Sequence, residues 1–237
     1  MIDASGYLSW DSEFFNKKIA FIDGFKANDR EIKTEIDKFL NTGTDCIYLY
    51  TRKPIDLQDY DAVLADRKRI YVLDRPKYNG MDYYPYQQQP IYNGDPSELY
   101  ELALQSGEHS RFKVDSHFSE EEFKNLYKKW IDNSVKEGFA DYVLVALDPE
   151  PQGFITAKIK KDNLSIGLFA TDKKHRGKGI GSRLIQDVIN VASKSGLKVE
   201  VVTQADNEIA CRFYESKGFS VKDEQYVYHI WNSSKHN

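Results

Sequence analysis

Cysteine is scarce in this chain, which has only Cys46 and Cys211 among its 237 residues. Two thiols are too few for a cysteine metal cluster or a disulfide framework, so we expect both to be reduced and buried, and we expect no metal. Long apolar runs are also absent, since none approaches the roughly 20 residues of a membrane-spanning helix. The first residues lack the apolar stretch of a signal peptide. These features predict a cytoplasmic protein with no membrane partner.

A surplus of positive charge is missing as well. The 33 lysines and arginines are outnumbered by 37 acidic residues, which gives a formal net charge of −4. Proteins that bind nucleic acid through its phosphates usually carry a basic surplus, so we expect no nucleic-acid partner. The 41% hydrophobic and 30% charged residues are ordinary for a soluble globular enzyme, and the length suffices for one large or two small domains.

The most informative stretch that is present is the basic, glycine-dense turn Thr171–Arg183. A strand-like apolar run precedes it, and an amphipathic, helix-like segment follows it. Glycines let a backbone approach an anion closely, and N–H groups at a helix N-terminus attract one, so this arrangement favours phosphate binding. The spacing Arg176-Gly177-x-Gly179-x-Gly181 differs from both the nucleoside-triphosphate P-loop and the dinucleotide fingerprint.

Residues 163–229 resemble the coenzyme A core of the GNAT superfamily of N-acetyltransferases. Residues 163–171 are similar to the family's central strand, and His175–Gly181 are similar to its pyrophosphate loop. The later part of the resemblance is carried by Asn207, Ala210, Phe213-Tyr214 and Gly218-Phe219. The resemblance implies a mixed α/β (α+β) GNAT fold and an acyltransferase with acetyl-CoA as co-substrate. It leaves open whether the acyl group is strictly acetyl.

The same resemblance implies roles for individual residues. Backbone groups of the strand would pair with the pantetheine arm of the coenzyme, and those of the turn would bind its pyrophosphate. These groups belong to Leu168, Phe169, Ala170, Arg176, Gly177, Lys178, Gly179, Ile180 and Gly181. The Asn207 side chain would hydrogen-bond the same arm. Tyr214 would protonate the departing sulfur as the catalytic acid, a role that suits a phenol with a pKa of about 10. The general base is not identified by the sequence.

Periodicity and helix breakers divide the chain into two parts. Residues 75–96 hold four prolines and two glycines and show no periodicity, so we expect a domain of residues 1–95 and a catalytic domain of residues 96–237. In the first part we expect strands at 19–25, 46–50 and 69–74 and a helix at 28–40. In the second we expect helices at 96–105, 119–134, 179–195 and 207–217, and strands at 142–147, 153–160, 164–170, 199–203 and 221–230.

A second resemblance extends beyond the coenzyme core. Leu8–Phe15, Ser110-Arg111-Phe112, Tyr127-x-x-Trp130-Ile131 and Leu168-x-Ala170-Thr171-Asp172 are similar to the dTDP-fucosamine acetyltransferase family. This similarity implies a degenerate GNAT-like N-terminal half. It also implies a nucleotide-linked aminodeoxysugar as acceptor, of the dTDP-4-amino-4,6-dideoxygalactose type. The residues that we expect to contact the acceptor are Trp10, Asp11, Phe15, Arg111 and Phe112. The alternatives are that the aromatic residues only pin the N-terminus to the core and that Arg111 forms a structural ion pair.

Two other functions stay open at this stage. The acceptor amine could belong to a peptide or another small molecule, or the chain could bind coenzyme A without turnover. Tyr78–Tyr92 is rich in tyrosine, which suits either stacking on a base or sugar or docking on a neighbour. A homodimer is a further expectation, since a twin subunit would cover an unpaired sheet edge.

Overall fold

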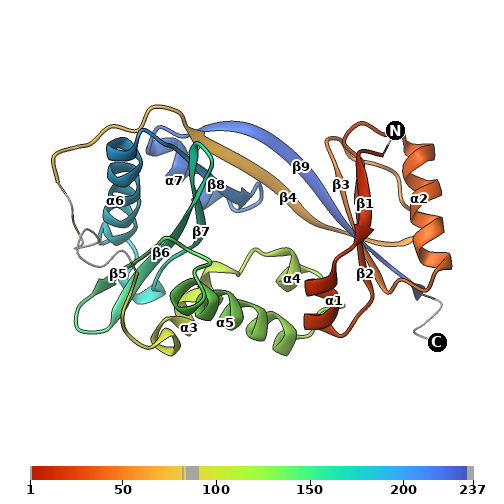
Figure 1. The fold of residues 1–237 in the computed structure, drawn as a ribbon, viewed down its shortest axis with the longest axis horizontal. Coiled ribbons are helices and arrows are strands. Elements are labelled where there is room, and N and C mark those ends of the chain that lie inside the picture. The colour runs from red at the N-terminus through yellow and green to blue at the C-terminus, as the bar shows by residue number, and fades with distance from the viewer. Residues whose placement is uncertain (1, 82, 84–90, 234–237) are drawn as a thin grey trace.

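The last strand of the chain lies inside the sheet, between a strand from the N-terminal part and the strand that follows that part (Figure 1). The structure is a computed structural model that describes residues 2–81, 83 and 91–233. In this part of the chain, strands form one mixed sheet in the order β1-β2-β3-β9-β4-β8-β7-β6-β5. Their bounds are β1 Ala4–Tyr7, β2 Ile19–Asp23, β3 Cys46–Thr51, β4 Asp61–Leu73, β5 Tyr142–Leu147, β6 Pro151–Lys160, β7 Asn163–Thr171, β8 Lys198–Gln204 and β9 Ser220–Trp231.

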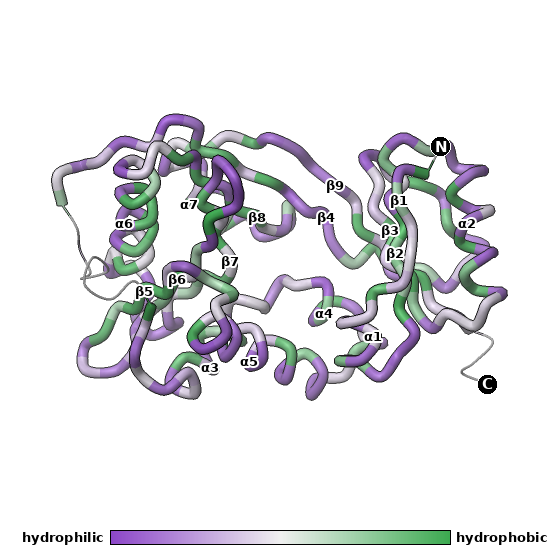
Figure 2. Tube along the Cα trace, in the orientation of Figure 1, coloured by the Kyte–Doolittle hydropathy of each residue, from purple (hydrophilic) through white to green (hydrophobic). Residues whose placement is uncertain are grey.

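Helices cover both faces of this sheet. Their bounds are α1 Ser9–Phe15, α2 Asp29–Asn41, α3 Tyr100–Ser106, α4 Arg111–Val114, α5 Glu120–Lys136, α6 Ile180–Ser195 and α7 Glu208–Ser216, with short 3-10 turns at Pro96–Leu99 and Lys173–His175. The buried cores show that α2, α6 and α7 pack on one face, and that α1, α3, α4 and α5 pack on the other. Figure 2 shows α2 with its hydrophobic side turned toward β1, β2 and β3 and its hydrophilic side outward.

Local signals set the ends of the two helices that the sequence predicts most strongly. Asn28 caps α2 and forms a capping box with Glu31, and Ser119 and Glu122 do the same for α5. Such boxes satisfy N–H groups that have no partner inside a helix. Both helices then bury the apolar stripe that their periodicity indicates.

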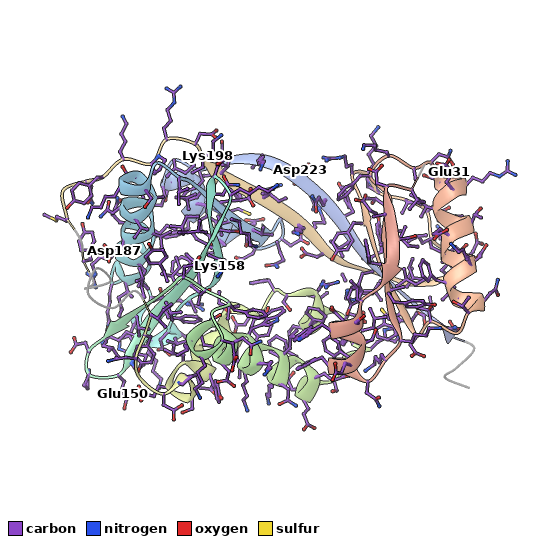
Figure 3. The ribbon with its side chains drawn as sticks, viewed as in Figure 1. Glu31, Glu150, Lys158, Asp187, Lys198 and Asp223 are labelled. Carbon is purple, nitrogen blue, oxygen red and sulfur yellow. The ribbon has the colours of Figure 1, made fainter. Side chains whose placement is uncertain are left out.

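The two parts of the chain share one sheet. β9 pairs with β3 on one side and with β4 on the other, and β4 also pairs with β8. An ion pair between Arg52, just after β3, and Asp223 on β9 (2.6 Å) adds to this connection; Asp223 is labelled in Figure 3. The division between residues 1–95 and 96–237 stays a prediction. In the sequence β4 comes before the expected boundary, but in the sheet it lies between β9 and β8, which both come after that boundary.

The mixed α/β fold is confirmed, while several local expectations differ from the structure. Strand β4 begins at Asp61 rather than at 69, because its first half carries charged residues that hide the strand pattern. The short elements β1, α1 and α4 were not expected, since four to seven residues are too few to show a period. Residues 82 and 84–90 of the tyrosine-rich stretch lie outside the described residues. In the described part, no helix has the length and hydrophobicity needed to cross a membrane.

Candidate active site

Strands β7 and β8 separate along part of their length. They pair in parallel only between residues 163–166 and 198–201, and residues 169–171 of β7 pair with β6 alone, after a shift in register. The Leu168 N–H donates to the Thr156 hydroxyl on β6 (2.8 Å). Because successive backbone groups of a strand point to opposite sides, the N–H and carbonyl of Phe169 face the open edge toward β8. This edge offers the hydrogen-bonding groups that an added extended chain requires.

The glycine-dense turn leads into the N-terminus of α6. Gly179 is the N-cap residue with φ of 78°, a left-handed conformation that favours glycine. Among the described residues, the N–H groups of residues 176–182 donate no recorded hydrogen bond. Arg176 and Lys178 also have no carboxylate partner in the described part of the chain. Unpaired N–H groups and free cations at a helix N-terminus form an anion-binding site.

Helix α3 holds this turn in place. The Gln105 side chain donates to Asp172 (3.2 Å) and accepts from the Lys173 N–H (3.0 Å). On the other side, the Arg176 Nε atom donates to the Thr171 carbonyl (3.3 Å). The anion site is therefore fixed relative to the C-terminal end of β7.

A cleft of about 340 Å³ lies where the open edge of β7, the turn and α7 meet. Six of the predicted residues line it, namely Phe169, Ala170, Arg176, Gly177, Asn207 and Tyr214. Its other wall is formed by Gln105, Ser106, Glu108 and His109 at the end of α3 and just after it. The structure thus brings together a strand edge, an anion site and a phenol that are separate in the sequence.

The remaining predicted coenzyme residues do not line this cleft with their side chains. Lys178, Gly179 and Gly181 belong to the turn and the first turn of α6, where they contribute backbone N–H groups. The Ile180 side chain is buried in the core, so only its backbone is available to a ligand. The Leu168 side chain lines a separate groove of about 590 Å³ near Lys158, which is labelled in Figure 3.

Tyr214 is a buried residue of α7 at the cleft wall. Its ring contacts Phe213, Phe219 and Tyr71, with centroids 5.5, 5.7 and 5.9 Å away. Burial raises the pKa of its hydroxyl well above the ordinary value, and the nearby Cys211 thiol adds to the shift. The phenol therefore stays protonated at neutral pH, and in this unliganded site it is a weaker acid than the ordinary phenol expected from the sequence.

Asn207 has a structural role besides its predicted one. Its side-chain oxygen caps α7 by accepting from the Ala210 N–H (3.1 Å). No hydrogen bond from the side-chain amide nitrogen of Asn207 is recorded in the described part of the chain. The cap holds the side chain at the cleft, where that nitrogen is able to donate to a ligand.

The five predicted acceptor residues gather where α1 meets α4. Phe15 and Phe112 are buried and stack on each other with centroids 5.4 Å apart, so packing accounts for both. Trp10 stacks on Phe14 at 5.1 Å and keeps 42% of its surface exposed. Burial raises the pKa of Asp11, and the nearby Arg111 opposes this shift. An acceptor role for these residues stays a prediction.

Arg111 is held by a buried polar network that the sequence did not reveal. The guanidinium donates to Nε2 of His229 (3.1 Å), so the imidazole proton lies on Nδ1, which donates to Asp115 (2.6 Å). Asp115 also accepts from the Trp231 indole (3.0 Å) and from His117. Burial lowers the pKa of His229 to about 4 in spite of Asp115, which keeps this imidazole neutral.

The guanidinium of Arg111 has no carboxylate within ion-pair distance in the described part of the chain. It lies against the rings of Tyr48 (4.0 Å) and Phe112 (4.4 Å). The structural ion pair considered from the sequence is therefore not found among the described residues. A planar cation without a counter-ion is suited to a phosphate or carboxylate from outside.

The residues present fit acetyl-CoA. The unpaired N–H groups of the turn match a pyrophosphate, and the open edge of β7 matches an amide-containing arm. Acetyl-CoA binding is typical of GNAT homologues.

Comparison with known proteins agrees with this geometry. The chain is 28% identical over 139 residues to the spore coat polysaccharide biosynthesis protein SpsD of Bacillus subtilis, covering 58% of this chain and about half (48%) of SpsD. It is 31% identical over 113 residues to N-alpha-acetyltransferase 30 of Schizosaccharomyces pombe, covering 44% of this chain and 74% of that protein.

The folds agree as well. The structure of a tandem GNAT protein from the clavulanic acid biosynthesis pathway matches 90% of this chain and 74% of its own with a TM-score of 0.54. At 12% identity this likeness shows the fold alone. Residues 97–219, just over half of the chain, match the Acetyltransferase (GNAT) family. The chain therefore belongs to the GNAT family of N-acetyltransferases.

Proposed function

We propose that this protein transfers an acetyl group from acetyl-CoA to the amine of a nucleotide-linked aminodeoxysugar, of the dTDP-4-amino-4,6-dideoxygalactose type. The observation that carries the acceptor class is Arg111, a half-buried guanidinium that no carboxylate neutralises in the described part of the chain. A planar fork of N–H donors fits the diphosphate of such an acceptor.

The position of Arg111 supports this assignment. His109 lines the cleft, and Arg111 follows two residues later, so its Cα lies within about 7 Å of a cleft residue along the chain. The resemblance to the dTDP-fucosamine acetyltransferase family favours the same class, and so does the similarity to SpsD, a spore coat polysaccharide biosynthesis protein.

This chain has a group for binding the coenzyme, for polarising the thioester and for protonating the sulfur. Acetyl-CoA supplies the acetyl thioester. The N–H groups of residues 176–181 hold its pyrophosphate, and the Phe169 N–H is placed to donate to the carbonyl oxygen, which makes the carbonyl carbon more electrophilic. Tyr214 donates a proton to the departing sulfur. The amine attacks the thioester directly, in a ternary complex of protein, acetyl-CoA and acceptor.

A peptide is the second candidate acceptor. The similarity to N-alpha-acetyltransferase 30 favours it, since that protein's name refers to N-alpha acetylation. A peptide has no diphosphate, so it would meet Arg111 only through a carboxylate.

The test is transfer of labelled acetyl from acetyl-CoA to a panel of nucleotide-linked aminosugars, free aminosugars and peptides. We expect the nucleotide-linked sugars to be acetylated and the free sugars to react far more slowly, because they lack the diphosphate. Efficient acetylation of peptides together with none of the nucleotide-linked sugars contradicts the proposed acceptor and leaves the acetyl transfer intact.

A further inference from the structure

One residue of β6, Thr156, lies opposite two residues of β7. The register of the two strands shifts between residues 155 and 157 of β6, so that Gly167 and Leu168 lie together opposite Thr156. Two residues that oppose one form a β-bulge. Since β7 pairs with β8 only up to residue 166, the bulge lies at the point where these two strands separate.

The bulge decides which backbone groups of β7 face the open edge. The Leu168 N–H points toward β6, so the N–H and carbonyl of Phe169 point toward β8. In a ladder without the extra residue, Gly167 alone would oppose Thr156, and Phe169 would turn its N–H and carbonyl toward β6. The edge that is open to the coenzyme therefore depends on this bulge.

The hydroxyl of Thr156 holds both backbone groups of Leu168. It accepts from the Leu168 N–H at 2.8 Å, and it donates to the Leu168 carbonyl at 3.5 Å. Only 3% of Thr156 is exposed, so solvent has little access to replace the hydroxyl. A buried N–H that loses its acceptor costs more free energy than a hydrogen bond contributes on average. The side chain of Thr156 thus stabilises the bulge against a one-residue slip.

Gly167 provides the space that this hydroxyl occupies. A Cβ atom on Gly167 would lie 2.8 Å from the Thr156 hydroxyl oxygen, which is too close for a carbon atom. Gly167 is not among the glycines with positive φ, so its backbone conformation does not require glycine. The contact with the hydroxyl is what requires the absence of a side chain here. Thr156 and Gly167 therefore act as a pair.

We propose that Thr156 is a positioning residue for acetyl transfer, because its hydroxyl, seated against Gly167, holds the bulge that turns the Phe169 N–H toward the thioester carbonyl. This inference rests on the proposed contact between that N–H and acetyl-CoA. Thr156 acts through the backbone of Leu168. It fixes the hydrogen-bonding groups that β7 offers to the pantetheine arm, and it sets the direction of the donor to the carbonyl oxygen.

The experiment compares Thr156→Val and Thr156→Ser by calorimetry of acetyl-CoA binding and by kcat with the best acceptor of the panel. Valine keeps the shape of threonine without the hydroxyl, so we expect Thr156→Val to bind acetyl-CoA about 10-fold more weakly. We expect its kcat to fall by about 10-fold to 100-fold, which is part of the effect of losing such a donor altogether. Thr156→Ser keeps the hydroxyl and should stay near wild type in both measurements.

Thr51→Val is the matched control for a purely structural loss. Thr51 is a buried threonine of β3 whose hydroxyl donates to the Lys53 carbonyl (2.7 Å), so this variant also loses a bond between a buried hydroxyl and the backbone. We expect both valine variants to lose stability, but only Thr156→Val to lose acetyl-CoA affinity and kcat. Wild-type affinity and kcat in Thr156→Val, or an equal loss in Thr156→Ser, overturns the assignment.

Gly167→Ala tests the same contact from the other strand, also where Thr156→Val does not fold. Its methyl group displaces the hydroxyl, so acetyl-CoA affinity and kcat should both fall. Gly6→Ala on β1, where a Cβ atom has its nearest neighbour at 3.7 Å, should change neither. Wild-type affinity and kcat in Gly167→Ala overturn the proposal. A wild-type protein that binds acetyl-CoA but acetylates no amine of the panel contradicts the proposed function, while the affinities of the variants still decide the role of Thr156.

Discussion

Arg111 donates a hydrogen bond to the Nε2 atom of His229 at 3.1 Å, and this bond orients the arginine without neutralising it. A carboxylate in the place of His229 would have formed an ion pair with Arg111 and occupied the N–H donors of its guanidinium. The neutral imidazole, held by Asp115 on its other nitrogen, leaves the remaining N–H donors of Arg111 available. A buried network of this kind keeps a cation oriented for an external anion.

Arg111→Lys should raise the KM for a nucleotide-linked acceptor by roughly 10-fold or more, with a smaller effect on kcat. Lysine keeps the charge but loses the planar fork and the contact with the Tyr48 ring. Steady-state kinetics with the acceptor varied gives this value. Arg69→Lys is a suitable control, because Arg69 pairs with Glu224 (2.7 Å) on the opposite face of the sheet. An unchanged acceptor KM in a folded Arg111→Lys protein argues against diphosphate binding there.

Tyr214→Phe should lower kcat by about 10² to 10⁴ and leave acetyl-CoA affinity nearly unchanged. The substitution keeps the buried ring and removes only the proton donor. Tyr71→Phe provides the control, since the Tyr71 ring is a neighbour and its hydroxyl donates to Glu215 (2.7 Å) rather than to the cleft. Wild-type turnover in Tyr214→Phe, with chemistry shown to be rate-limiting, would exclude Tyr214 as the acid.

Gly179→Glu should weaken acetyl-CoA binding severely, because it places a negative charge at the anion site and a side chain where φ is 78°. Gly196→Glu is the matched control: Gly196 also has a positive φ (67°) but lies at the other end of α6. Calorimetry of acetyl-CoA binding to both folded variants separates the effect of charge at the turn from the effect of a side chain at a positive φ. Equal acetyl-CoA affinities for Gly179→Glu and Gly196→Glu speak against phosphate binding by the turn.

Asp66→Asn should stabilise the fold at pH 8 and have little effect near pH 4. Burial raises the pKa of Asp66 in the fold to about 6, so the fold favours the protonated side chain. The stability that this protonated form contributes to the wild type is fully present below the unfolded pKa of about 4. That contribution is lost as the pH rises through 6. Allowing for partial exposure, we expect a gain of about 1 to 2 kcal/mol in the free energy of unfolding at pH 8.

Chemical denaturation of wild type and Asp66→Asn at the two pH values measures this gain, with Asp206→Asn as the variant that should show none. A stability difference that is the same at pH 4 and pH 8 is incompatible with a raised pKa for Asp66.

The sequence by itself determined the features that depend on neighbouring residues. The glycine-dense turn before α6 is one contiguous segment, so the order of its glycines and basic residues can be read directly from the sequence. The capping boxes of α2 and α5 span three residues each, and the apolar stripes that follow them repeat within one helix. These signals predicted the helices and an anion-binding turn, while the GNAT fold was expected from the resemblance of residues 163–229 to that family.

Only the tertiary structure decided which distant residues meet at the acceptor side. Asp115 and His229 are 114 positions apart, and they touch because β9 enters the sheet between β3 and β4. Asp66 and Lys68 face the same side of the sheet as Gln204 because β4 pairs with β8 and a bulge sets the register of β4. Strand register and strand order depend on the packing of the whole sheet, and a shift of one residue turns a side chain to the other face. No local pattern in the sequence contains that information.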